Sequence, residues 1–181
     1  MDVATETAPV KPLTRFLAGL QAGMLAVIVM LGWLGLSAMW HRHTFWKAPN
    51  EMATVLRGNS AIGPGFAAST WSGIALYVLA YSLLGALFAL AAPRKLTVLG
   101  LMLIGVLVSM AWYVVWFRVL GQSLMPLVWL LHEERPMEFA HVLFGVMLAR
   151  FPVYLEPRPK PAATEEPAPE VQPEMHADEH E

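Results

Sequence analysis

The chain has 181 residues, of which 56% are hydrophobic and 14% are charged, and its net charge at pH 7 is −2. Soluble domains carry about 25% charged residues, so this composition, with a mean hydropathy of +0.50, favours an integral membrane protein. The absence of cysteine excludes disulfides, thiol catalysis, Cys-ligated zinc and iron–sulfur clusters.

Long apolar runs predict the fold class. Three stretches lack Asp, Glu, Lys and Arg, and each holds the roughly 20 apolar residues that a spanning helix needs. A fourth apolar run follows near the end of the chain. We therefore predict an all-α membrane protein with four transmembrane helices in an up-down bundle. The predicted spans are residues 16–39, 72–92, 97–117 and 137–155.

The spans lie within a predicted transmembrane domain of residues 13–155. Residues 1–12 are polar and lack periodicity, which predicts a disordered arm. Residues 156–181 are rich in Pro, Ala and Glu, with eight acids and two bases. This composition buries too little apolar surface for a core and predicts a disordered acidic tail.

Two connections carry predicted short helices. Asn50 is interpreted as an N-cap and Gly58 as the residue after a helix, so residues 51–57 should form a surface helix. Residues 123–131 are apolar but too short to cross a bilayer. Gly121 and Pro126 argue against their continuing the third span, so they should form an interfacial or re-entrant helix before the last span.

Small residues recur inside the predicted spans. Such residues let two membrane helices approach closely. The candidates for helix packing are Gly19, Gly23, Gly85, Gly105, Gly145 and Ala149.

Charges and tryptophans suggest an orientation. The tight basic loop at Arg94 and Lys95 favours both termini in the cytoplasm, because short basic loops remain inside. Six of the seven tryptophans and all histidines outside the tail then fall at the outer end of the bundle. That outer face is where function should be sought.

The last span contains an unusual pair, Glu138 and His141. An ionisable residue within a membrane suggests a functional site, although Glu138 can equally be a first-turn acid stabilised by the helix dipole. His41, His43, His141 and Glu138 are the candidate metal ligands, with Glu133 and Glu134 near them in the sequence. A shared metal site requires the Cα atoms of His41 and His141 to lie within about 12 Å.

Other chemistry lacks support in the sequence. No glycine-rich phosphate loop, Ser–His–Asp arrangement or basic nucleic-acid patch is present. The chain is therefore not expected to be an enzyme, to hold a cofactor or to bind nucleic acid.

Three features together resemble a known family. They are the tight turn Pro93-Arg94-Lys95-Leu96, the segment from Leu120 to Trp129, and Glu138-Phe-Ala-His141 opening a last span that ends at Arg150. This pattern resembles the small YagU-type family of bacterial inner-membrane proteins over about residues 13–155. The resemblance implies a multi-pass protein of the bacterial inner membrane and implies no activity.

Two functions remain open at this point. One is a non-enzymatic accessory, assembly or envelope-stress protein acting through its outer, periplasmic cap on the lipid bilayer, another membrane protein or a second copy of itself. The alternative is a redox or metal-handling protein that binds a transition metal or haem through the outer-face histidines.

Overall fold

The computed structural model describes residues 11–63, 65–93 and 96–155, and every regular element within them is helical. Most of the predicted arm and the whole predicted tail, 156–181, lie outside the described residues, as do Arg94 and Lys95. Three helices are long and apolar enough to cross a membrane: Pro12–Trp40, Ala68–Ala91 and Val98–Leu124. Within these described residues, the prediction of an all-helical fold with long apolar helices is therefore confirmed.

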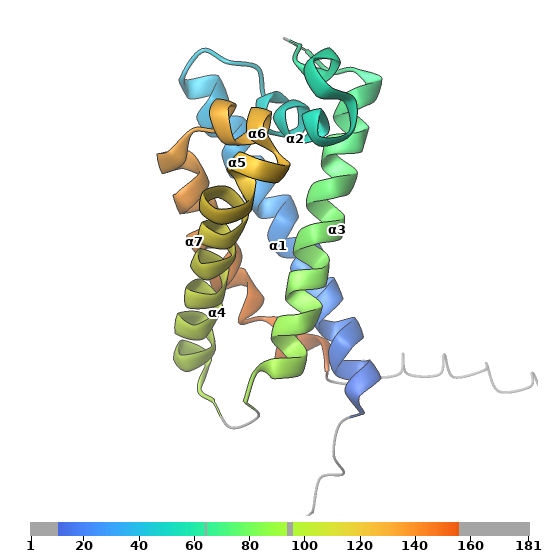
Figure 1. The fold of residues 1–181 in the computed structure, drawn as a ribbon. Helices are drawn as coiled ribbons and strands as arrows, with labels where there is room; N and C mark the ends of the chain where they lie inside the picture. Colours follow the sequence, from blue (N-terminus) through green and yellow to red (C-terminus); the bar gives the residue numbers. More distant parts are fainter. Residues whose placement is uncertain (1–10, 64, 94–95, 156–181) are drawn as a thin grey trace, which may run out of the picture.

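The long helices form a row rather than a closed ring (Figure 1). Helix α1 (Pro12–Trp40) packs against both α3 (Ala68–Ala91) and α7 (Glu134–Leu148), and α7 also packs against α4 (Val98–Tyr113). Between α3 and α4 lies an apolar groove of about 410 Å³. The order across the molecule is thus α3, α1, α7, α4.

Glycines set the two closest helix contacts. A Cβ atom on Gly19 or Gly23 of α1 would clash with the backbone of α3 around Ser82 and Gly85. Between α4 and α7, a Cβ atom on Gly105 would meet the carbonyl of Gly145, and one on Gly145 would lie 2.5 Å from the Cα atom of Val106. Ala149 is also buried, just past the end of α7.

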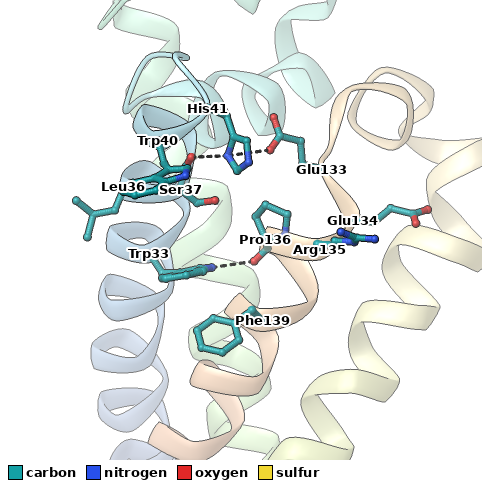
Figure 2. Close-up of a pocket in the computed structure, with 10 residues that line it drawn as sticks. All are labelled: Trp33, Leu36, Ser37, Trp40, His41, Glu133, Glu134, Arg135, Pro136 and Phe139. Carbon is teal, nitrogen blue, oxygen red and sulfur yellow. Dashed lines mark hydrogen bonds and ion pairs between the residues drawn. The ribbon is translucent and has the colours of Figure 1, made fainter.

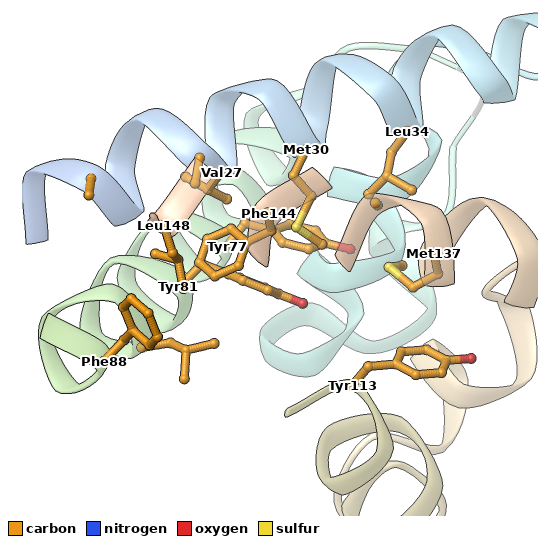
Figure 3. Close-up of a cluster of buried hydrophobic side chains, with 14 of the residues drawn as sticks. Val27, Met30, Leu34, Tyr77, Tyr81, Phe88, Tyr113, Met137, Phe144 and Leu148 are labelled. Atoms are coloured by element: carbon orange, nitrogen blue, oxygen red, sulfur yellow. The ribbon is translucent and has the colours of Figure 1, made fainter. Parts of the chain in front are cut away.

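Aromatic and aliphatic side chains fill the centre of the row (Figure 3). Met30 of α1, Tyr77 and Tyr81 of α3, and Phe144 of α7 are almost fully buried there. Tyr81 packs edge-on against Phe144, with 5.0 Å between the ring centroids. These contacts join three helices that are distant in the sequence.

The helix that holds the third predicted span continues past residue 117. Helix α4 runs on through a π-helical segment, η2 (Val114–Leu120), and α5 (Gly121–Leu124), so the expectation that Gly121 stops it is wrong. The helix ends at Leu124. The next residue, Met125, has a φ of −140° and directly precedes Pro126. A proline disfavours helical geometry in the preceding residue, whereas Gly121 is accommodated within the helix.

The last apolar run is not a single helix over residues 137–155. Helix α7 ends at Leu148, and a 3₁₀ turn, η3 (Phe151–Tyr154), follows. Pro152 lacks an amide hydrogen and its ring would collide with the preceding turn of an α-helix. The fourth apolar element is therefore a 15-residue helix plus a short 3₁₀ extension.

A cap of short helices covers one end of the row. It comprises α2 (Lys47–Arg57), η1 (Gly58–Ala61), α5 and α6 (Pro126–Leu131) (Figure 1). Asn50 lies inside α2 and is buried, so its interpretation as an N-cap is wrong. Its amide donates to the carbonyls of Gly63 and Gly65 and accepts a 2.6 Å hydrogen bond from the Thr70 hydroxyl, which ties the connecting loop to α3.

Candidate functional site

The candidate residues divide between the cap and the buried centre. Helix α1 ends at Trp40, so His41 and His43 follow it into the cap. His141 lies seven residues inside α7, about 10 Å along the helix axis from its start. Among the contacts of the described residues, no hydrogen bond, ion pair or ring contact joins His141 to His41 or His43.

His141 is completely buried and both of its ring nitrogens are engaged. Nδ1 lies 2.8 Å from the Met137 carbonyl oxygen, which can only accept, so Nδ1 carries the hydrogen. Nε2 then accepts a 2.8 Å hydrogen bond from the Tyr81 hydroxyl. Because neither nitrogen has a free lone pair, this histidine links α7 to α3 and is not poised as a metal ligand.

The backbone around His141 is also fixed. The Ser109 hydroxyl on α4 donates a 2.7 Å hydrogen bond to the His141 carbonyl oxygen. The rings of Tyr113 and Phe117 face the imidazole at centroid distances of 5.1 and 6.1 Å. One residue of α7 therefore contacts both outer helices of the row.

Glu138 lies apart from the histidines. It is half-buried and forms no hydrogen bond or ion pair within the described parts of the chain. Across residues 11–63, 65–93 and 96–155, no group of three His, Asp or Glu side chains lies close enough to hold a metal ion.

The cap histidines instead surround Glu133, one residue before α7. His43 Nε2 and His41 Nδ1 lie 3.5 and 4.0 Å from the Glu133 carboxylate, and Lys47 of α2 forms a direct ion pair with it. Burial alone would raise the pKa of Glu133, but Lys47 and the two histidines outweigh burial and lower it. This cluster connects the end of α1, the start of α2 and the start of α7.

Glu51 completes the charge cluster. Lys47 lies 3.6 Å from its carboxylate, one helical turn away. Burial raises the pKa of Glu51 to about 7, since the attraction of Lys47 only partly offsets the loss of solvent and Glu133 adds repulsion. Glu51 and Lys47 did not stand out in the sequence, because an i, i+4 acid–base pair is typical of any exposed helix.

A groove of about 870 Å³ lies between α1 and α7 at the cap end (Figure 2). Trp33, Leu36, Trp40 and Phe139 form its apolar wall. Its polar rim contains His41, Glu133, Glu134 and Arg135.

Trp33 fixes the shape of this groove. Its indole N–H donates a 3.0 Å hydrogen bond to the Pro136 carbonyl oxygen, and its ring lies 4.5 Å from the Phe139 ring (Figure 2). The indole therefore holds α1 and α7 together at the base of the rim. Trp33 is the one tryptophan outside the group of six that the sequence places at the outer end of the bundle.

The groove has the chemistry of an amphipathic binding site. Aromatic side chains with a polar atom are favoured where one end is apolar and the other is wet. A concave apolar surface with a few polar groups at one edge is the usual form of a small-molecule site.

Comparison with protein-family models, curated proteins and solved structures found no match for the chain.

Proposed function

We propose that this chain is an integral membrane protein that crosses the bilayer four times and binds a membrane lipid in the α1–α7 groove. The observation that carries the proposal is the groove itself, with its wall of Trp33, Leu36 and Phe139 and its polar rim at the cap. It acts as a non-enzymatic accessory protein through this end. A bacterial inner membrane with cytoplasmic termini is part of the same proposal.

The fourth crossing is supported by contacts along α1, which is itself long enough to span. Near its start, the Arg15 guanidinium lies 5.9 Å from the Phe151 ring, and near its other end Trp33 contacts Pro136. Eighteen helical residues separate Arg15 and Trp33, a rise of about 27 Å. The chain from Pro136 to Phe151 itself rises about 24 Å, so it covers most of the roughly 30 Å of hydrocarbon.

Site-specific photo-crosslinking tests the proposed function. A benzophenone amino acid at Phe139 reports on the groove, and one at Leu107 of α4, which is also exposed, reports on the general lipid surface. We expect one dominant lipid adduct at position 139 and a broad mixture at position 107.

Two results would count against lipid binding in the groove. The same mixture at both positions would mean that the groove does not select a ligand. A discrete protein adduct at position 139 would instead assign the groove to a membrane partner or a second copy of the chain.

A further inference from the structure

The rim of the α1–α7 groove carries two acids, and both are already paired with bases outside the groove. Glu133 pairs with Lys47, and Glu134 lies 2.9 Å from Arg118 Nη2. Neither Lys47 nor Arg118 lines this groove. Each acid at the rim therefore already has a basic partner within the protein, although Glu133 shares Lys47 with Glu51.

Arg135 has no such compensation. It lines the same groove, its side chain is exposed, and it forms no ion pair with any residue that the structure describes. The rim consequently carries one positive charge that has no ion-pair partner among the described residues, and Figure 2 shows it beside Glu134. Guanidinium groups favour phosphate because their planar donors match its oxygens in pairs.

The start of α7 adds little to this charge. The helix begins at Glu134, and Glu133 before it makes no side-chain cap. Of the first three residues only Glu134 and Arg135 carry amide groups, because Pro136 has none, and the Glu134 carboxylate offsets part of the positive end of the helix dipole. The Arg135 side chain lies at this end of α7, and Figure 2 shows it beside Glu134, across Pro136 from Trp33.

On this basis, and resting on the proposed function, we propose that the groove selects an anionic phospholipid, whose phosphate binds at Arg135 and whose acyl chain lies against Trp33, Leu36 and Phe139. A phospholipid carries both a charged phosphate for the rim and a long apolar chain for the wall of the groove. A zwitterionic lipid offers the same chain, but its own cation competes with Arg135 for the phosphate.

The test is native mass spectrometry of the full chain in detergent, titrated with dioleoylphosphatidylglycerol or dioleoylphosphatidylcholine. The variants are Arg135→Gln and, as a matched control, Arg57→Gln. Arg57 is an exposed arginine of the same cap that does not line the groove. Circular dichroism melts establish that both variants are folded.

We expect wild type and Arg57→Gln to favour phosphatidylglycerol, and Arg135→Gln to lose about tenfold of that preference, the worth of one charge-assisted hydrogen bond. Equal preference in Arg135→Gln and Arg57→Gln would overturn the headgroup assignment. In that case, continued lipid binding by wild type would leave the proposed function intact, whereas no binding of either lipid would refute both.

Discussion

His141 illustrates how a conspicuous residue can have a structural role. Its Nδ1–H group donates to its own helix and its Nε2 accepts from Tyr81, so all of its hydrogen-bonding capacity is used inside the row. A buried polar pair in an apolar centre stabilises one arrangement of helices, because any other arrangement leaves the pair unsatisfied. The sequence indicated that His141 was special but could not identify its partner, sixty residues away on α3.

Replacing Tyr81 with phenylalanine should therefore destabilise the protein. The change leaves Nε2 of a fully buried histidine without a donor, which costs about 1–3 kcal/mol. Thermal unfolding in detergent should show a lower Tm.

Tyr77→Phe is the control, because Tyr77 stacks on Tyr81 with 5.7 Å between ring centroids but makes no hydrogen bond through its hydroxyl. Equal losses in both variants would show that packing, not the hydrogen bond, matters.

Glu51 should make stability depend on pH. Its pKa is about 7 in the folded protein and near 4.5 when the chain is unfolded. A raised pKa means that the folded state binds the proton more tightly, so the stabilisation is complete below pH 4.5 and is lost as pH rises to 7. The loss should amount to at most about 3 kcal/mol.

The measurement is the Tm between pH 5 and pH 8. Wild type should lose stability across this range, and Glu51→Gln should be nearly flat and more stable than wild type at pH 8. Glu134→Gln removes an acid from an exposed ion pair of the same cap and should keep the wild-type slope. A Glu51→Gln variant that retains the full slope would assign the titration to another group.

At the level of single elements, small residues determine which helix faces meet. The sequence predicted Gly19, Gly23, Gly85, Gly105 and Gly145 as packing positions, since glycine permits close approach wherever a partner exists. It could not say which glycine faces which. That pairing depends on the order of the helices, α3–α1–α7–α4, and no helix length or composition determines it.

Gly145→Ala should separate α4 from α7. The added Cβ atom would sit 2.5 Å from the Val106 Cα atom, and backbone cannot move aside as a flexible side chain can. Overpacking of this kind costs about 1–3 kcal/mol. Gly32→Ala in α1 is the matched control, because nothing lies within 4 Å of its added Cβ atom. We expect the Tm to fall for Gly145→Ala only, and an unchanged Tm would contradict the close contact.

Two helix ends differ from their predicted positions for the same reason. Proline, not glycine, ends the helices: Pro126 lies just past the end of the third span and Pro152 just past α7. Glycine inside a helix costs about 1 kcal/mol, which a long apolar helix tolerates. Proline removes a hydrogen bond and adds a steric clash, so it dominates the outcome.

At the scale of the whole molecule, the lengths of the apolar runs predicted the long helices. Backbone amide and carbonyl groups inside a bilayer must bond to one another, and a helix satisfies all of them within one segment. The grooves were not predictable, since each is formed by side chains from separate helices. The α1–α7 groove, for example, combines Trp33 and Leu36 with Phe139, about a hundred residues later. The same reason explains why the cluster of His41 and His43 around Glu133 could not be predicted.

The central claim is that the α7 and η3 segment crosses the membrane, and cysteine labelling tests it most directly. The chain has no cysteine of its own, so single substitutions can be read without background. Ser60→Cys marks the cap, Lys11→Cys marks the opposite end, and Glu134→Cys and Leu155→Cys flank the segment. Intact spheroplasts are treated with a membrane-impermeant maleimide.

We expect labelling of Ser60→Cys and Glu134→Cys at once, and of Lys11→Cys and Leu155→Cys only after the membrane is permeabilised. Labelling of Leu155→Cys together with Glu134→Cys in intact spheroplasts would contradict the fourth crossing.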